Sequence, residues 1–203
     1  MHKKKLKYCC DIFRGVQINQ KEKKGGNEES QKFYILNYDD ISTNLSLKNT
    51  ININLEESKE AVYINTDKKY KDIQVQNQDL IIPAKLVRHK PKIIDYQNNE
   101  NLNLIYSFEL FVIKVADKKE LDPKFLFYLF NSDSMSDYLD NKAKEYNKGR
   151  SGNFNRITLQ MLEEIEIEVL SIEEQRRIVK QVEKLNKLKF EVESNLKKIF
   201  TSN

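Results

Sequence analysis

The chain has 203 residues, which suffices for one globular domain with an appendage and is too short for two full enzyme domains. Only 39% of the residues are apolar and 33% are charged, so the composition favours an elongated or helix-bearing molecule. The net charge of +4 is mildly basic, and neither a long apolar run nor a signal-peptide core is present, which predicts a cytoplasmic protein without a membrane span.

The first segment, residues 1–24, is the most basic part of the chain and contains both cysteines. Eight Lys and Arg residues stand there against two acidic residues. Cys9 and Cys10 are adjacent, and neighbouring cysteines rarely bridge each other. Because the chain also has only two histidines, we expect neither a disulfide framework nor a metal site.

Two further segments carry an excess of positive charge. Residues 84–94 hold four basic residues and no acidic one, and residues 142–156 hold five basic residues against Glu145. If the fold brings the three basic segments to one face, they form a track for phosphate groups. The alternative is that these lysine-rich segments are ordinary solvated surface.

The middle of the chain is predicted to form β-strands. Apolar, β-branched and aromatic residues dominate or alternate with polar ones in several short runs, as is typical of strands. These runs cover residues 33–38, 45–55, 61–65, 73–76, 79–84 and 104–115. The last of them is long and rich in β-branched and aromatic residues, so we expect it to be a central strand.

Helices are predicted after residue 121. Asp122 and Pro123 are typical of a helix start, and a second start is expected at Ser134. A short helix is predicted from Thr158, followed by a strand with Ile165, Ile167 and Val169 on one face. Together these elements indicate an α+β fold, with a mixed or antiparallel β domain and short helices.

The C-terminal segment is predicted to be one long helix from Ser171 to about residue 200. Ser171 and Glu174 are spaced as a capping box. Apolar residues recur at alternating intervals of four and three, which is a heptad pattern that favours a coiled coil with a partner helix. The stripe consists of Ile178, Val182, Leu185, Lys189, Val192, Leu196 and Ile199, with Lys189 at the one polar position. The alternative is an amphipathic helix that packs on its own domain.

Several motifs, each weak alone, occur in an order that resembles a known family. The chain opens with Leu6-Lys7-Tyr8 and Ile12-Phe13-Arg14-Gly15, and Asp79-Leu80-Ile81-Ile82 precedes a basic segment. The second half contains Leu121-Asp122-Pro123-Lys124-Phe125-Leu126, then Gly149-Arg150-Ser151-Gly152-Asn153, then Glu174-Gln175-Arg176-Arg177-Ile178-Val179. In order and spacing the chain resembles the specificity subunits of Type I restriction-modification systems.

The resemblance implies a DNA-reading protein that is not an enzyme and uses no cofactor. Such subunits hold methyltransferase subunits and, through them, restriction subunits. In agreement, the sequence has no glycine-rich loop for S-adenosylmethionine, no Asn-Pro-Pro-Tyr-like motif and no Walker motif. Family members usually have two target-recognition domains and two helical regions, whereas this chain has one of each and looks like a half-subunit.

The resemblance and the charge pattern together divide the chain in two. Residues 1–170 are predicted to be the target-recognition domain, and residues 171–203 the helical region for homodimerisation and subunit docking. Lys and Arg neutralise phosphates, while Arg, Lys, Asn, Gln and Ser can read base edges in the major groove. The predicted DNA contacts are Lys85, Arg88, His89, Lys90, Lys92, Lys148, Arg150, Ser151, Asn153, Asn155 and Arg156.

Other interpretations remain at this point. The asparagines around Gly152 fit a tight turn as well as a DNA contact. The runner-up function is a scaffold or inhibitor that binds a methyltransferase subunit without reading DNA. A nuclease is a third hypothesis, but the sequence has no credible cluster of metal-binding acids.

Overall fold

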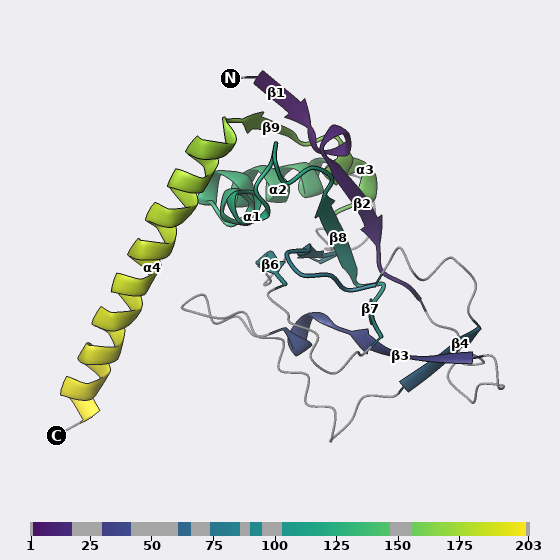
Figure 1. Ribbon diagram of the computed structural model, residues 1–203, viewed down its shortest axis with the longest axis horizontal. Coiled ribbons are helices and arrows are strands. Elements are labelled where there is room, and N and C mark those ends of the chain that lie inside the picture. Colours follow the sequence, from purple (N-terminus) through teal and green to yellow (C-terminus); the bar gives the residue numbers. More distant parts are fainter. Residues whose placement is uncertain are drawn as a thin grey trace.

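The computed structural model is an α+β molecule with a long helix that projects from the domain (Figure 1). The structure describes residues 2–17, 30–41, 61–65, 74–85, 90–94, 103–146 and 156–201. The short helices gather at one end of the main sheet, and the smaller sheet that contains β3 and β4 lies at the other end (Figure 1). The expected fold class is thereby confirmed.

The strands form three sheets. β2, β8, β5 and β6 form a four-stranded sheet in that order, β4, β3 and β7 form a three-stranded sheet, and β1 pairs with β9. All pairs are antiparallel except β3 with β7. The strands are β1 (His2–Lys5), β2 (Cys10–Arg14), β3 (Ser30–Leu36), β4 (Ala61–Asn65), β5 (Leu80–Pro83), β6 (Lys92–Ile93), β7 (Leu104–Tyr106), β8 (Leu110–Val115) and β9 (Glu166–Val169).

The helices are short except for the last. α1 packs against α2 and α4, and α3 lies near β2. Two single-turn 3₁₀ helices, η1 and η2, follow β1 and β3. Their bounds are η1 (Leu6–Tyr8), η2 (Tyr38–Asp40), α1 (Pro123–Phe130), α2 (Asp133–Tyr146), α3 (Leu159–Glu163) and α4 (Ile172–Thr201).

The core lies on both faces of the four-stranded sheet. Along β5, Leu80 and Ile82 pack with residues of the helices, whereas Ile81 packs with residues of β3 and β7. β8 repeats this alternation, with Ile113 on the helical side and Val112 on the other. Because successive strand residues point to opposite faces, the buried parts of both central strands, Leu80–Ile82 and Leu110–Ile113, must be apolar throughout, as they are.

Of the three helix starts predicted before residue 160, two are confirmed and one is displaced. The Asp122 carboxylate accepts hydrogen bonds from the backbone N–H groups of Lys124 (2.8 Å) and Phe125 (3.2 Å). The Thr158 hydroxyl caps α3 in the same way. α2, however, begins at Asp133, and the hydroxyl of Ser132 rather than that of Ser134 accepts the Met135 N–H at 3.3 Å.

The strand predictions are correct for 61–65 and approximate for 33–38 and 79–84. The run 104–115 was expected to be one central strand, and this is wrong: a turn at Ser107 divides it into β7 and β8, which belong to different sheets. In 73–76, of which residues 74–76 are described, only Gln74 forms a bridge, to Ile105. Residues 45–55 lie outside the described part of the chain.

Candidate nucleic-acid interface

An open hollow of about 950 Å³ lies where five parts of the chain meet. Its lining comes from the end of β2, from η2, from the end of β5, from the turn between β7 and β8, and from the residues before and at the start of α3. The basic lining residues are Arg14, Lys85 and Arg156, the acidic ones are Asp39, Asp40 and Glu109, and the aromatic ones are Tyr38, Phe108 and Phe111.

Lys85 and Arg156, from two different basic segments of the sequence, meet at this hollow. They are paired in an antiparallel β-bridge, and the Ile157 N–H donates to the Ala84 carbonyl at 3.1 Å. Both side chains are exposed. Backbone hydrogen bonding fixes the pair, so the two side chains lie next to each other irrespective of their own contacts.

Lys92 does not belong to this surface, so its predicted DNA contact is withdrawn. Only 7% of the residue is exposed, and its amino group donates to the carbonyls of Tyr38 (2.9 Å) and Ile41 (2.6 Å). The ammonium also lies 3.6 Å from the centroid of the Tyr38 ring. Burial lowers the pKa of Lys92. An amino group held in this way fastens η2 to β6 and is not presented to a phosphate.

The neighbouring Lys90 is exposed, and its backbone carbonyl accepts the Tyr38 hydroxyl at 2.7 Å. Burial, and secondarily the negative charge of Asp39, raises the pKa of Tyr38 to about 12, so the hydroxyl remains a donor at neutral pH.

The other predicted DNA contacts lie outside the described residues. They are Arg88, His89, Lys148, Arg150, Ser151, Asn153 and Asn155.

Arg14 is a lining residue that the sequence analysis did not include among the DNA contacts. Its Nε donates to the Phe108 carbonyl at 2.7 Å, and its guanidinium lies 5.6 Å from the centroid of the Phe108 ring and 5.5 Å from that of Phe111. Arg14 directly precedes Gly15, which the fold requires for a close backbone approach to Ser107, but no local sequence signal links the arginine itself to that turn.

The acidic residues of the lining offset the positive charge of the hollow. The Asp40 carboxylate accepts the Asn37 N–H at 2.7 Å and so caps η2. Asp39 and Glu109 are exposed in the same lining as the three basic residues. An anion at this site would therefore be held by specific contacts with positioned cations, because the three basic and three acidic residues of the lining balance in charge.

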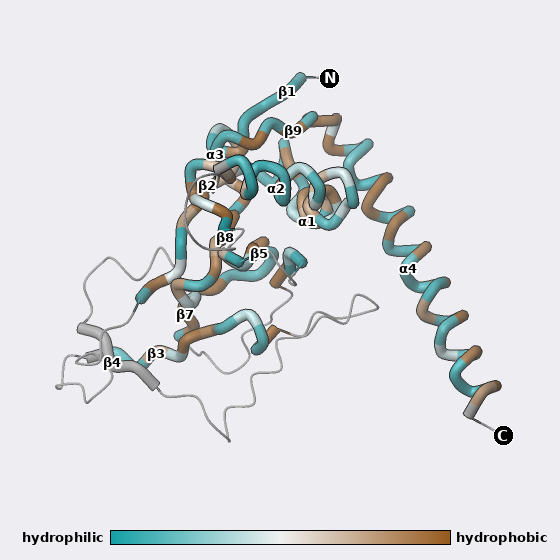
Figure 2. The backbone as a smooth tube through the Cα atoms, turned by 180° about the vertical axis from the view of Figure 1, so that it is seen from behind, coloured by the Kyte–Doolittle hydropathy of each residue, from teal (hydrophilic) through white to brown (hydrophobic). Residues whose placement is uncertain are grey.

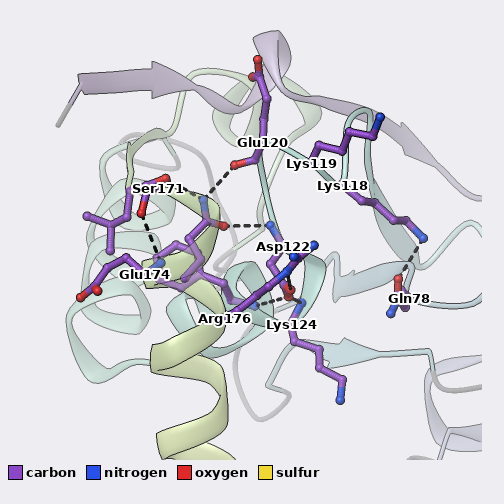
Figure 3. A network of polar contacts seen from close by, with 12 residues as sticks. Gln78, Lys118, Lys119, Glu120, Asp122, Lys124, Ser171, Glu174 and Arg176 are labelled. Atoms are coloured by element: carbon purple, nitrogen blue, oxygen red, sulfur yellow. Dashed lines mark hydrogen bonds and ion pairs between the residues drawn. The ribbon is translucent and has the colours of Figure 1, made fainter.

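The second candidate surface is on α4, and its first half is fastened to the domain. Gln175 is fully buried: its amide nitrogen donates to the carbonyls of Glu120 (2.8 Å) and Leu170 (2.9 Å), and its amide oxygen accepts the Asp122 N–H at 2.8 Å. The bonds that end at Glu120 and Asp122 are among the dashed lines in Figure 3. Val179 is also buried. The Ser171 hydroxyl caps the helix at the Glu174 N–H as predicted (3.2 Å), while the Glu174 carboxylate binds Arg177.

The predicted apolar stripe of α4 is divided between the domain and solvent. Ile178 packs at the edge of the core, and Val182 is half-buried. Apolar residues recur along the rest of the helix, as the brown segments in Figure 2 show. In this second half the exposed fractions are 65% for Leu185, 75% for the Lys189 side chain, 57% for Val192, 47% for Leu196 and 63% for Ile199.

The described residues contain no group of three or more His, Cys, Asp or Glu residues placed to hold a metal ion. None of the helices in that part of the chain is long and apolar enough to cross a membrane.

Comparisons with known proteins identify the fold. No protein-family model and no curated protein matches the chain. Among solved structures, a chain from a study of complex assembly and conformational transition in the type I R-M system is similar over 98% of this chain and 43% of its own length, with a TM-score of 0.55 and 19% identity. The HsdS subunit from Thermoanaerobacter tengcongensis is similar over 92% of this chain and 37% of its own, with a TM-score of 0.53 and 16% identity. The protein therefore has the fold of a Type I specificity subunit and spans less than half the length of these two relatives.

Proposed function

We propose that the protein binds double-stranded DNA as a non-catalytic recognition subunit of a Type I restriction-modification system. The observation that carries the proposal is the meeting of Lys85 and Arg156 from separate basic segments in one hollow, on a fold shared with specificity subunits. Paired cations on fixed backbone are suited to two successive phosphates of a DNA strand. Residues 1–170 are the recognition domain in this proposal.

Base reading is assigned to the segments that adjoin the hollow in sequence. Residues 86–89 directly follow Lys85, and residues 148–155 end directly before Arg156. They carry the predicted contacts Arg88 and Arg150, and an arginine can bond a guanine edge through two hydrogen bonds. Lys85 and Arg156 would set the register of the DNA, and the adjoining side chains would supply the sequence preference.

The second half of α4 is proposed to pair with α4 of a second copy. Four apolar residues, Leu185, Val192, Leu196 and Ile199, are exposed on one stripe with heptad spacing, while the first half of the helix is already fastened to its own domain. Lys189 lies on the same stripe and is proposed to fix the register, because a buried polar position disfavours alternative pairings. A homodimer of this kind would read a symmetric, two-part DNA site.

Methyltransferase subunits, and restriction subunits bound through them, are the other proposed partners. This part of the proposal rests on the structural relative studied for complex assembly in the type I R-M system. Residues 171–203 would provide the docking helix.

A scaffold that binds a methyltransferase subunit without touching DNA is the second candidate. The acidic residues in the hollow favour it, because Asp39 and Glu109 repel phosphates. A titration of the protein against a fluorescein-labelled duplex of mixed sequence, at several salt concentrations between about 50 and 200 mM, separates the two. The recognition hypothesis predicts binding by the protein alone, with an affinity that falls linearly in a double-logarithmic plot against salt. Binding that appears only after the methyltransferase subunit is added would support the scaffold.

A further inference from the structure

The turn between β7 and β8 presents an exposed phenylalanine at the rim of the hollow. The turn is closed by a hydrogen bond from the Leu110 N–H to the Ser107 carbonyl (3.0 Å), and the Ser107 hydroxyl accepts the Glu109 N–H (3.3 Å). Ser107 itself is buried, with 6% exposed. Phe108 at the tip is 40% exposed and belongs to the lining of the hollow.

This turn is held rigidly by the end of β2. The Gly15 N–H donates to the Leu110 carbonyl and the Val16 N–H donates to the Tyr106 carbonyl, both at 2.9 Å. A Cβ atom on Gly15 would lie 2.2 Å from the Ser107 carbonyl oxygen, so only glycine allows the two backbones to approach this closely. The position of Phe108 is thus fixed by backbone contacts that do not involve its ring.

The side chain of Arg14 lies against the Phe108 end of this turn. Its Nε donates to the Phe108 carbonyl, and its guanidinium lies within cation–π distance of the Phe108 ring, at 5.6 Å from the centroid. Within the described part of the chain the Nη groups of this exposed side chain make no hydrogen bond or ion pair. Because Nε is anchored, those Nη groups are presented in a fixed orientation beside an apolar ring.

We propose that Arg14 and Phe108 form a single nucleotide-contacting tip, in which Phe108 packs against the sugar and base of one nucleotide and Arg14 binds its phosphate. The inference rests on the proposed DNA binding and deepens it. Lys85 and Arg156, in the same hollow, would hold the neighbouring phosphates. Rigid apolar side chains next to an arginine are used by DNA-binding proteins to engage a groove and to sense how readily its base steps deform.

The roles of the two residues predict different salt dependences. An apolar contact releases no counterions, so Phe108→Ala should weaken duplex binding about tenfold, the range expected for losing one base contact, and leave the salt slope unchanged. Arg14→Gln should also weaken binding and should reduce the magnitude of the slope by about 0.9, the value for one phosphate contact. The probe is a fluorescein-labelled duplex of mixed sequence, and the full chain is used throughout.

Matched controls are available on α4. Phe190 is 43% exposed, close to the 40% of Phe108, so Phe190→Ala removes a phenylalanine of similar exposure. Lys180→Gln removes one exposed positive charge, as Arg14→Gln does. Both controls should bind the duplex like the parent. Thermal melting of each variant checks folding, and Phe108→Leu, which keeps an apolar side chain on the turn, should retain an affinity between those of the parent and Phe108→Ala.

The outcomes separate this inference from the proposed function. Weaker binding by Lys85→Gln together with parental binding by Phe108→Ala and Arg14→Gln would overturn the tip and leave DNA binding in place. A reduced affinity of Phe108→Ala that is matched by Phe190→Ala would also overturn it. If the parent protein binds no duplex at any salt concentration, the proposed function and the tip fail together.

Discussion

The hollow and the second half of α4 are built in opposite ways. The hollow is assembled from five parts of the chain, and backbone bonds such as the Lys85–Arg156 bridge place its side chains. The apolar stripe of α4 belongs to one continuous segment, and it extends into solvent away from the sheets (Figures 1 and 2). A substitution in the hollow therefore tests a surface that depends on the whole fold, whereas a substitution late in α4 tests an assembly contact with little effect on the domain.

The largest effect is expected where α4 meets the domain. Gln175→Leu removes three buried hydrogen bonds and leaves the Glu120 and Leu170 carbonyls without the amide donor. We expect the free energy of unfolding to fall by about 3 kcal/mol, since each buried group left unpaired costs about 1–3 kcal/mol. Urea unfolding followed by circular dichroism measures it, with the exposed Lys180→Ala as the control. A loss no larger than that of the control would mean that Gln175 does not fasten the helix.

The next effect concerns self-association through the second half of α4. Leu185→Gln with Leu196→Gln places two polar amides on the proposed seam and should weaken self-association by about 150-fold or more, because two buried leucines at about 1.5 kcal/mol each contribute about 3 kcal/mol. Light scattering across a concentration series reports the mass. Lys187→Gln with Lys198→Gln, on the other side of the helix, should leave the mass unchanged. A monomeric parent, or a variant of unchanged mass, would contradict the proposed seam.

A smaller effect on DNA binding is expected when one acidic residue of the hollow is neutralised. Asp39 lines it and is exposed, so Asp39→Asn removes a repulsion and should strengthen duplex binding about two- to threefold at low salt, with the gain shrinking as salt rises. Asp137→Asn removes the same charge outside the hollow lining and serves as the control. Equal gains from both variants would show that net charge, and not the hollow, governs binding.

The smallest effect concerns the β1–β9 end of the domain that carries α4. Lys5 and Lys7 lie 2.5 Å from the Glu164 carboxylate, and these hydrogen bonds lower the pKa of Glu164 to about 2 from an ordinary value of 4.5. A carboxylate with a lowered folded-state pKa stabilises the fold above pH 4.5, and that stabilisation is lost as the pH falls toward 2. Unfolding midpoints at several pH values in this window should therefore fall less steeply for Glu164→Gln than for the parent. Parallel pH profiles for the two proteins would rule this contribution out, and Glu166→Gln should follow the parent.

Local signals predicted the helices and part of the sheet. The start of α1 at Asp122 and Pro123 and the cap of α4 at Ser171 depend on neighbouring residues, so the sequence suffices for them. β1 was not predicted, because His2–Lys5 is polar and forms a strand by pairing with β9, far away in the chain. The division of 104–115 into β7 and β8 likewise depends on a contact with Gly15 that no window of sequence contains.

The candidate site was predictable only as a set of residues. Charge placed Lys85 and Arg156 in separate basic segments, but their pairing requires the backbone bridge of the folded chain. The same charge count included Lys92, which the fold buries against Tyr38, and it gave Arg14 no distinct role. The long helix α4 is confirmed, while the division of its apolar stripe into a packed half and an exposed half depends on how far the domain reaches along the helix.

The central claim is that the hollow binds the DNA backbone through Lys85 and Arg156. Because their pairing is made by backbone atoms, Lys85→Gln with Arg156→Gln removes both charges and leaves the bridge intact. The measurement is the slope of log affinity against log salt for a mixed-sequence duplex. Loss of two phosphate contacts should reduce its magnitude by about 1.8, whereas the control Arg176→Gln with Lys180→Gln on α4 should keep the parental slope. A double variant whose slope equals that of the parent would contradict the account.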